Sequence, residues 1–465
     1  MASLALPFHS YTLDSRQANN ARLLNCYAEQ LPVGGKAPLV LRTAPGVTGI
    51  ETVGTGPGRG LIEWRNAVYK VSGTKLYRVS GSSATELGTI PGTGRVFMAG
   101  NPTQLVINVP GVGGYVWNGT TVAQITDPDF LAWNPGACDF ADNYILFVNE
   151  GTGQFFGSDL ADATSYDALN FATAEEAPDD LVTLKTSQSE VILLGKTTGE
   201  RWYNAGTSGF PFARIPGGTF ELGCIAKRSA FKLDNTIGWL ASDLTVRMLR
   251  GAVPMRVSQH GVEAAIRSYA RVDDCEAFTY TLDGHLCAVL RFPSAGAAWV
   301  YDATTQEWHE RQTYGYAGFD IADCAMLGGV PYVQSATTGR VGRLTSDVYS
   351  EFGNILRGEA TFQGVQTPGN ARLFHQRLEL LCEVGVGLIS GQGSDPRLTL
   401  EMSNDGGLTW HTLPTRSLGA IGRYQQRVKW DALGSSRHRV YRLSWSDPVP
   451  FTVWGANLEA EGEAA

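Results

Sequence analysis

LIEWRNAVYKVSGTKLYRV, residues 61–79, contains three short apolar segments separated by two turns. The first turn falls at Arg65-Asn66 and the second at Ser72-Gly73-Thr74. Turns of this length join antiparallel neighbours, and residues of these types permit the backbone to reverse. The stretch therefore predicts three antiparallel strands connected by tight hairpins.

The same order of strand, hairpin and turn recurs downstream, with a period of about 35–40 residues. Six further units follow the first, at residues 94–125, 137–158, 181–205, 229–249, 275–311 and 323–344. Four-stranded blades bury their faces only by stacking on neighbours, so the repeat predicts a β-propeller over residues 51–350, with about seven blades. A β-solenoid would need shorter and more regular repeats, and a β-sandwich would end after about 100–150 residues.

Two segments lie outside the repeat. Residues 1–50 contain four prolines and little periodicity, which predicts an extended N-terminal arm that becomes ordered by lying on another surface. Residues 355–460 contain further strand-like segments and predict a C-terminal β-sandwich-like domain. The fold class is therefore all-β, and the best candidate for a helix is VEAAIRSYA at residues 262–270.

The composition favours assembly over nucleic-acid binding. Only 18% of the 465 residues are charged and the net charge is −8, which leaves long, weakly charged surfaces that another protein can cover. Tight binding to DNA requires clustered Lys and Arg, because contacts to phosphates dominate the affinity. The acidic balance argues against such binding, although it permits loose passage of DNA.

The cysteines predict neither a disulfide framework nor a metal site. Their number is odd, no CxxC pair occurs, and no His stands at metal-ligand spacing, so we expect buried thiols in a reducing cytoplasm and no cofactor or metal. The seven are Cys26, Cys138, Cys224, Cys275, Cys287, Cys324 and Cys382. The N-terminal MASLALPFHSY lacks the charged and apolar parts of a signal peptide, and no apolar run is long enough to span a membrane, so export by that route is not expected.

Two strings look catalytic but favour structural interpretations. SNDGGLTW (residues 403–410) matches the Asp-box found on sialidase propellers, which is a turn in which Ser and Asp cap backbone amides and Trp packs on the sheet. LLGKTTG (residues 193–199) contains a P-loop-like Gly-Lys-Thr, but Glu190 stands where a P-loop needs glycine.

No nucleophile or zinc-protease motif occurs, so the sequence predicts no enzyme. Acidic pairs for glycoside hydrolysis stay open, because the sequence does not place its 45 carboxylates in space. The alternative function is therefore a propeller glycosidase or carbohydrate-binding protein.

One concentration of basic residues occurs near the C-terminus. In alternating strands such residues favour a solvated sheet face over a surface that docks an acidic partner or DNA, and both interpretations stay open. Its members are Arg416, Arg423, Arg427, Lys429, Arg437, Arg439 and Arg442.

Several short segments share their order with one known family. ARLLNCYAEQLP (residues 21–32) and VLRTAPGVTGI (residues 40–50) are followed by the first two repeat units, then by AAIRSYA (residues 264–270) and WVYDATTQEW (residues 299–308). In these segments the chain resembles the packaged-DNA stabilization protein family, the tail hub or nozzle proteins of short-tailed bacteriophages.

The resemblance implies a structural protein of the virion tail, made in the host cytoplasm. Such a protein forms a homohexameric ring below the portal and its adaptor, or head-completion protein, where it retains packaged double-stranded DNA and conducts it during ejection. Tail fibres or spikes, and a plug or needle, attach to the ring. The family supplies no catalytic residues, and the resemblance implies only an interface role for Asn25, Tyr27, Glu29, Arg42, Pro45 and Gly46.

Overall fold

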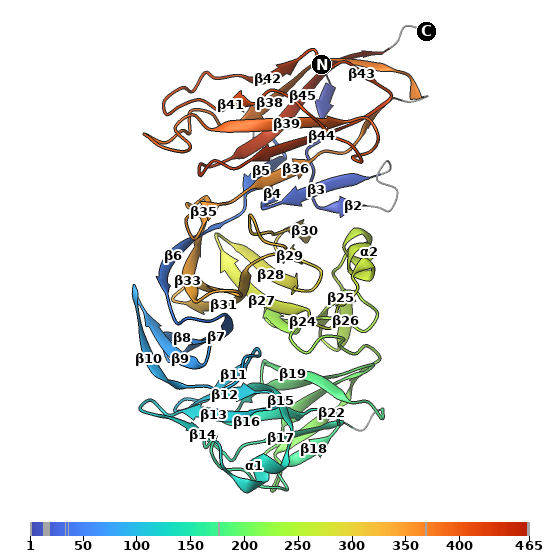
Figure 1. Ribbon diagram of the computed structural model, residues 1–465. Coiled ribbons are helices and arrows are strands. Elements are labelled where there is room, and N and C mark those ends of the chain that lie inside the picture. Colours follow the sequence, from blue (N-terminus) through green and yellow to red (C-terminus); the bar gives the residue numbers. More distant parts are fainter. Residues whose placement is uncertain are drawn as a thin grey trace.

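A computed structural model of the chain describes residues 2–12, 19–32, 34–35, 37–174, 177–367 and 370–462 (Figure 1). Most of these residues lie in antiparallel strands, grouped into a set of four-stranded sheets and a separate pair of larger sheets. Figure 1 shows the four-stranded sheets around a common centre, with the pair of larger sheets beside them. The predicted all-β class, with a propeller and a C-terminal sandwich, is confirmed.

Within the described residues the propeller has seven blades. The first strand of each blade is innermost, because these strands contact one another in a closed ring in which the seventh meets the first. The innermost strands are β7 (Gly58–Trp64), β11 (Phe97–Gly100), β15 (Pro135–Ala141), β19 (Leu181–Ser187), β23 (Phe231–Leu233), β27 (Glu276–Leu282) and β31 (Ile321–Leu327).

Blades one to six are each built from four strands consecutive in the chain. Tight hairpins join them, as at Arg65 and Asn66, which both adopt positive φ between β7 and the next strand. The outer strands are β8 (Ala67–Ser72), β9 (Lys75–Ser80), β10 (Ser83–Thr89), β12 (Leu105–Val109), β13 (Gly113–Trp117), β14 (Val122–Gln124), β16 (Tyr144–Asn149), β17 (Gln154–Gly157), β18 (Phe171–Thr173), β20 (Glu190–Gly195), β21 (Gly199–Asn204), β22 (Phe212–Phe220), β24 (Thr236–Leu240), β25 (Val246–Arg250), β26 (Val253–Arg256), β28 (His285–Phe292), β29 (Ala297–Asp302) and β30 (Glu307–Glu310).

Blade seven is completed by the N-terminal part of the chain. Strands β31, β32 (Val330–Ser335) and β33 (Arg340–Thr345) continue the repeat, and β6 (Gly46–Thr52) pairs antiparallel with β33 as the fourth strand. Strand β6 therefore closes the ring of blades. It spans residue 50, where the sequence places the end of the arm, and the short strands β34 (Ser350–Glu351) and β35 (Asn354–Ile355) extend its sheet.

The C-terminal domain is a β-sandwich that contains strands from the arm. One sheet has the order β4-β5-β45-β38-β42, and the other has the order β3-β36-β44-β39-β40, with β3 also joined in parallel to β30 of blade six. Their strands are β3 (Asn20–Leu24), β4 (Cys26–Gln30), β5 (Leu39–Thr43), β36 (Gly358–Thr361), β38 (Leu373–Cys382), β39 (Arg397–Ser403), β40 (His411–Thr412), β42 (Val428–Asp431), β44 (His438–Trp445) and β45 (Thr452–Gly462). Five short strands pair with β45, β3, β44, β39 and β38, respectively: β1 (Ala2–Leu4), β2 (Tyr11–Thr12), β37 (Val365–Gln366), β41 (Arg416–Ser417) and β43 (Ser435–Ser436).

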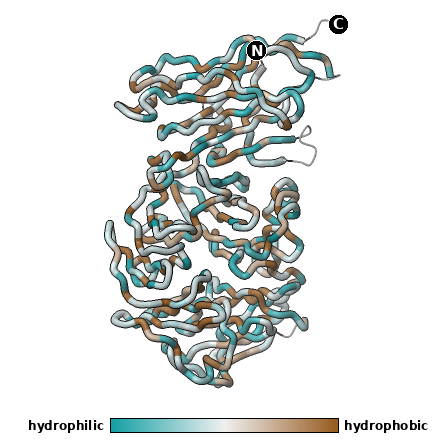
Figure 2. Tube along the Cα trace, in the orientation of Figure 1, coloured by the Kyte–Doolittle hydropathy of each residue, from teal (hydrophilic) through white to brown (hydrophobic). Residues whose placement is uncertain are grey.

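The surface on which the arm lies thus belongs to the chain's own C-terminal domain. Leu23 on β3 and Leu41 on β5 are buried in one core with Leu400 and Tyr441 of the C-terminal strands. Figure 2 shows hydrophobic residues distributed through propeller and sandwich alike, as expected when each blade interface has its own core. Six of the seven cysteines are buried, Cys324 is half-buried, and all are free thiols.

The described chain has two helices, α1 (Pro128–Ala132) and α2 (His260–Ser268). The Asp127 side chain caps α1 by accepting hydrogen bonds from the amides of Asp129 and Phe130. Helix α2 overlaps the predicted segment and buries Val262 and Ile266, one turn apart, against blades five and six. Within the described ranges, no helix has the length and apolar character of a membrane span.

Candidate functional site

The residues for which the resemblance implies an interface role meet at the junction between propeller and sandwich. Asn25 is buried between β3 and β4 with φ of 50°, in the left-handed region that Asn tolerates. Its Nδ2 donates to the carbonyl oxygens of Gln312 and Arg357 at 2.8 Å each, and its Oδ1 accepts from the amide of Gln312 at 3.1 Å. Asn25 therefore ties the arm to the end of blade six and to the start of the C-terminal domain.

Tyr27, Glu29 and Arg42 lie on the β4–β5 hairpin and are each half-buried. Tyr27 and Arg42 are opposite each other in register, and Arg42 Nη1 forms a 3.0 Å ion pair with Glu29 Oε2. The Tyr27 ring meets the edge of His285 of blade six at 5.0 Å, and burial raises the pKa of its hydroxyl to about 12. The hairpin thus contacts the propeller with one residue and presents a charged pair at its surface.

Pro45 and Gly46 form the passage from the sandwich into blade seven. The Pro45 carbonyl accepts a 3.0 Å hydrogen bond from Arg311 Nη2. Gly46 lies so close to the chain at Val348 that a Cβ would overlap the Val348 carbonyl oxygen. The structure thus brings all six residues together, and a role toward other chains stays a prediction.

An ion-pair network at the same junction was not predicted from the sequence. Arg22 of β3 pairs with Glu310 of blade six at 2.8 Å and with Glu359 of β36 at 3.3 Å. Glu359 is 4% exposed and also pairs with Arg357 at 3.3 Å. We call Arg22, Glu310, Arg357 and Glu359 the junction network. The partners of Arg22 lie 288 and 337 positions away, so local sequence gives no signal for them.

The Asp-box forms a structural turn beside this network. Ser403 Oγ accepts hydrogen bonds from the amides of Asp405 and Gly407, and Asp405 accepts from the amides of Leu408 and Thr409. The hydroxyls of Ser403 and Thr409 also donate to the Asp405 carboxylate, and these hydrogen bonds hold the pKa of Asp405 below its ordinary value. The predicted role as a capped turn is confirmed, and Asn20 of the arm binds it by donating to the Gly406 carbonyl at 3.1 Å.

The P-loop-like string forms the hairpin between β20 and β21. Its amides at Thr197 and Thr198 donate to Asp179, at 2.6 and 2.9 Å. Lys196 forms a 2.6 Å ion pair with Asp180. A carboxylate of the protein therefore occupies the position that a phosphate would take, and the blade-hairpin interpretation is confirmed.

The basic concentration near the C-terminus does not form one surface. Arg439 is buried and donates to Asn404 and to the Leu433 carbonyl, whereas Arg427 is exposed and pairs with Glu379 at 2.7 Å. Arg442 pairs with Glu401 at 2.7 Å and covers the Trp410 ring at 4.0 Å. These contacts disperse the charge through the sandwich, so neither sequence interpretation describes the whole set.

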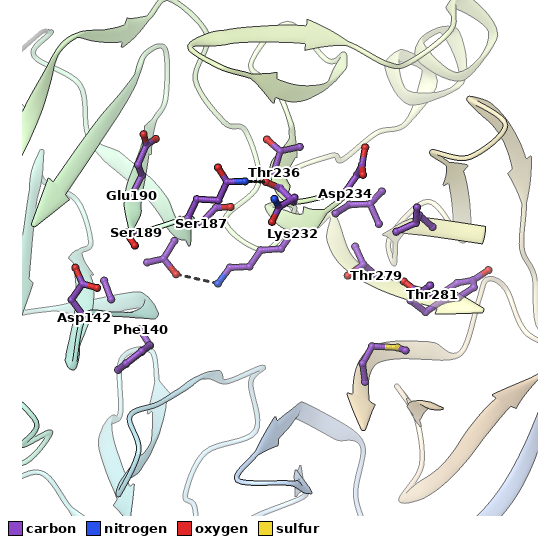
Figure 3. A pocket seen from close by; sticks show the side chains of 18 residues that line it. Phe140, Asp142, Ser187, Ser189, Glu190, Lys232, Asp234, Thr236, Thr279 and Thr281 are labelled. Atoms are coloured by element: carbon purple, nitrogen blue, oxygen red, sulfur yellow. Dashed lines mark hydrogen bonds between the residues drawn. The ribbon is translucent and has the colours of Figure 1, made fainter. Parts of the chain in front are cut away.

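The propeller axis contains charged side chains around two hollows in series. The outer hollow, of about 550 Å³, is lined by residues of blades three to seven, and Figure 3 shows Lys232 in the middle of its lining residues. Lys232 binds Asp139 at 2.9 Å and Thr186 Oγ1 at 3.1 Å. The inner hollow, of about 130 Å³, is lined from all seven blades. Among the described residues, no group of three or more His, Cys, Asp and Glu side chains could hold a metal ion.

Together these features define a class: a seven-bladed propeller, closed by a strand from its own arm and joined to a β-sandwich that contains the rest of that arm. The chain belongs to the Bacteriophage P22 Gp10 family, whose beta-propeller matches residues 14–349 and whose beta-sandwich matches residues 363–461. The family predicted from the short shared segments is confirmed.

One similar protein is the "Tail hub protein gp10" of Salmonella phage P22, which is 25% identical over 447 residues, with 90% of this chain and 91% of that protein covered. Among solved structures, the computationally designed Ika8 protein is 15% identical with a TM-score of 0.40, covering 72% of this chain and 99% of the designed one. The extracellular domain of BT4673 from B. thetaiotaomicron is 9% identical with a TM-score of 0.44, covering 86% and 58%. The structural similarities are too low to carry an argument.

Proposed function

We propose that this chain is a structural tail hub protein of a bacteriophage virion. The observation that carries this proposal is the family match, which covers propeller and sandwich in the same order, together with a relative named as a tail hub that aligns with nine-tenths of the chain. The integrated arm supports the same role, because it makes propeller and sandwich one mechanical unit.

In detail, the proposed assembly is a homohexameric ring that continues the channel of the portal and adaptor, retains packaged DNA and conducts it during ejection. Tail fibres or spikes, and a plug or needle, would attach to this ring. The net charge of −8 suits a channel wall, because each contact between a cation and a phosphate would slow sliding DNA.

We propose the β4–β5 hairpin as part of the contact between subunits. Strand β4 is terminal in its sheet, so along its outer edge the described chain pairs no further strand. Tyr27, Glu29 and Arg42 are half-buried there, and exposed edges of sheets are natural docking sites. Asn25 and Gly46 are buried and would act by holding the hairpin in place.

Native mass spectrometry and negative-stain imaging of the purified chain, alone and with its portal–adaptor complex, test the ring. We expect closed rings of identical chains in at least the second sample. Tyr27→Ala with Glu29→Lys should weaken ring formation, whereas Lys196→Glu, in an exposed hairpin of blade four, should not. A chain that stays monomeric in both samples would contradict the proposal.

We also propose that the protein has no enzymatic activity. The Asp-box, which motivated the glycosidase alternative, is a turn whose Ser403 and Asp405 bind the amides of their own loop. A panel of glycans, assayed for hydrolysis and for binding, tests this proposal. Hydrolysis that survives substitution of Asp405 but disappears on substitution of another acidic residue would show a catalytic site elsewhere.

A further inference from the structure

The innermost strands of the propeller bring several charged side chains into one small hollow. Arg95, Lys185, Arg228, Glu276 and Asp323 all line the cavity of about 130 Å³ on the axis, from blades two, four, five, six and seven. The other lining side chains are mainly apolar, and Lys227 pairs with Glu150 at 2.8 Å. The charge balance of the hollow therefore depends on how these five groups are paired.

Arginines already neutralise both carboxylates of the hollow. Arg95 pairs with Glu276 at 3.0 Å and with Asp323 at 2.7 Å. Glu276 also accepts from Arg291 at 2.9 Å. These arginines hold the pKa of Glu276 below its ordinary value despite burial, so the carboxylate is ionised and fully engaged.

Lys185 and Arg228 have no comparable partners. Arg228 Nη2 donates to the Val96 carbonyl at 3.0 Å and its guanidinium covers the Phe97 ring at 4.5 Å, but its buried Nη1 has no hydrogen-bond partner within the described chain. Outside the backbone pairing of β19 with β20, the Lys185 ammonium forms no hydrogen bond or ion pair with any described residue. The carboxylate that attracts it, Asp139, is already bound by Lys232.

Lys185 and Arg228 are half-buried, with Arg228 Nη1 fully buried, and this loss of solvent is unfavourable for their charges in the free protein. Burial lowers the pKa of Arg228 to about 10, and the nearby charge of Arg95 acts in the same direction. Burial also lowers the pKa of Lys185. An unpaired cation away from water either loses its proton or takes up a counter-anion, and an arginine retains its proton near neutral pH. The hollow therefore has a positive excess that an anion would relieve.

We propose that the propeller axis binds one small oxyanion of the inorganic phosphate class, held between Lys185 and Arg228. The planar guanidinium of Arg228 and the ammonium of Lys185 can together donate hydrogen bonds to several oxygens of such an ion. A cavity of about 130 Å³ accommodates one such ion with a few waters, since a water molecule takes about 30 Å³ in the liquid, and it excludes a nucleotide. The site is independent of the proposed tail hub role.

An entry route to the site runs along the axis. Cys138 and Lys185 line the inner hollow, whereas their near neighbours Phe140 and Thr186 line the outer one. The ion pair between Lys232 and Asp139 lies on the same strands, between the two hollows. A small anion would pass this pair to reach Lys185, and a larger molecule would stop at the outer hollow.

Isothermal calorimetry and thermal unfolding of the full chain test the proposal, with inorganic phosphate titrated against chloride at constant ionic strength. We expect one phosphate bound per chain and a saturable rise in the unfolding temperature. Sulfate should compete with phosphate, because it offers the same oxygens. Adenosine monophosphate carries its phosphate group on a nucleoside that is too large for the hollow. It should therefore neither compete with phosphate nor produce a saturable rise in the unfolding temperature.

Two variants separate binding from folding. Lys185→Met and Arg228→Met remove charge but retain length, and each should weaken phosphate binding at least about tenfold. Without phosphate, Lys185→Met should unfold at the same temperature as the unmodified chain or higher, because it removes an unpaired buried cation. Lys196→Met, on the surface of blade four, is the control and should bind phosphate normally. The proposal would be overturned if phosphate had no saturable effect on the unmodified chain, or if its effect on both axial variants were as large as on the unmodified chain.

Discussion

The junction network and the propeller axis both contain charged side chains that are shielded from solvent. Only the junction network pairs all of its charged side chains. At the junction, Arg22 lies between Glu310 and Glu359, and each carboxylate has an arginine within 3.3 Å. On the axis, Arg95 is paired in the same way, whereas Lys185 and Arg228 form no ion pair with a carboxylate of the described chain. Paired buried charges fix the relative position of two domains, while unpaired ones create a field that favours a ligand.

The largest effect is expected from breaking the junction network. Glu359→Gln removes the buried charge shared by Arg22 and Arg357, so the partly exposed Arg357 loses its ion pair and Arg22 keeps only Glu310. We expect a loss of about 2 kcal/mol in the free energy of unfolding, measured with urea, because Glu359 is buried but both arginines remain in reach of water. Glu51→Gln, on the exposed part of β6, is the matched control and should change little. Equal stability of Glu359→Gln and the unmodified chain would show that the network does not hold the domains together.

Closure of blade seven should be nearly as sensitive. Gly46→Ala places a Cβ against the Val348 carbonyl, and backbone on both sides must move to accommodate it. The expected loss is about 1–3 kcal/mol in the free energy of unfolding. Gly94→Ala, where an added Cβ meets no atom within 4 Å, should cost much less. Similar losses of stability for the two variants would mean that the close approach of the chain at Gly46 does not cause the loss.

A smaller effect involves pH, because the junction also holds a histidine that stays neutral. Burial, assisted by the positive charge of Arg311, lowers the pKa of His309 from 6.5 to about 3. Below pH 6.5 the unfolded chain takes up a proton that the folded chain excludes, so stability falls as the pH falls toward 3. This group alone should remove between about 1 and 2 kcal/mol from pH 7 to pH 5.

His309→Gln should flatten that pH dependence, whatever its effect on absolute stability. The measurement is the free energy of unfolding at pH 7 and pH 5, compared with the same difference for His411→Gln on the exposed strand β40. An unchanged slope in His309→Gln would mean that His309 takes up its proton at the same pH in the folded and the unfolded protein.

The smallest effect concerns the access of solvent and reagents to one buried thiol in each of the two regions. Cys26 at the junction and Cys138 on the axis are 0% and 3% exposed, and burial raises the pKa of both thiols. We expect iodoacetamide to modify neither in the native protein and both after unfolding, as mapped by mass spectrometry. Rapid modification of Cys138 alone would show that the axis opens widely to solvent.

The propeller was predictable because its signal is local. Each hairpin, such as the one at Arg65 and Asn66, is encoded within a few residues, and the repeat shows how the hairpins combine. The strands of the arm carry no such signal. β6 pairs with β33 almost 300 positions later, and β4 and β5 join a sheet with β45, so their partners emerge only in three dimensions.

The axial site was missed for a related reason. Lys185 stands among apolar residues in LVTLKTS, which only weakly indicates that its side chain points into the interior of the propeller. Its relation to Arg228 depends on the convergence of innermost strands from different blades, which spacing along the chain does not show. The Asp-box was interpreted correctly, because Ser403, Asp405 and Gly407 make their contacts within one turn.

The pairing of β1 with β45 has a consequence for synthesis on the ribosome. Strand β1 is translated long before its partner β45 and stays unpaired until then, and β6 stays unpaired until β33 is made. A chain released before residues 452–462 are made exposes open sheet edges, which tend to aggregate. Chains that lack β45 would then be lost before assembly, so the pairing of β1 with β45 selects chains in which both strands are present.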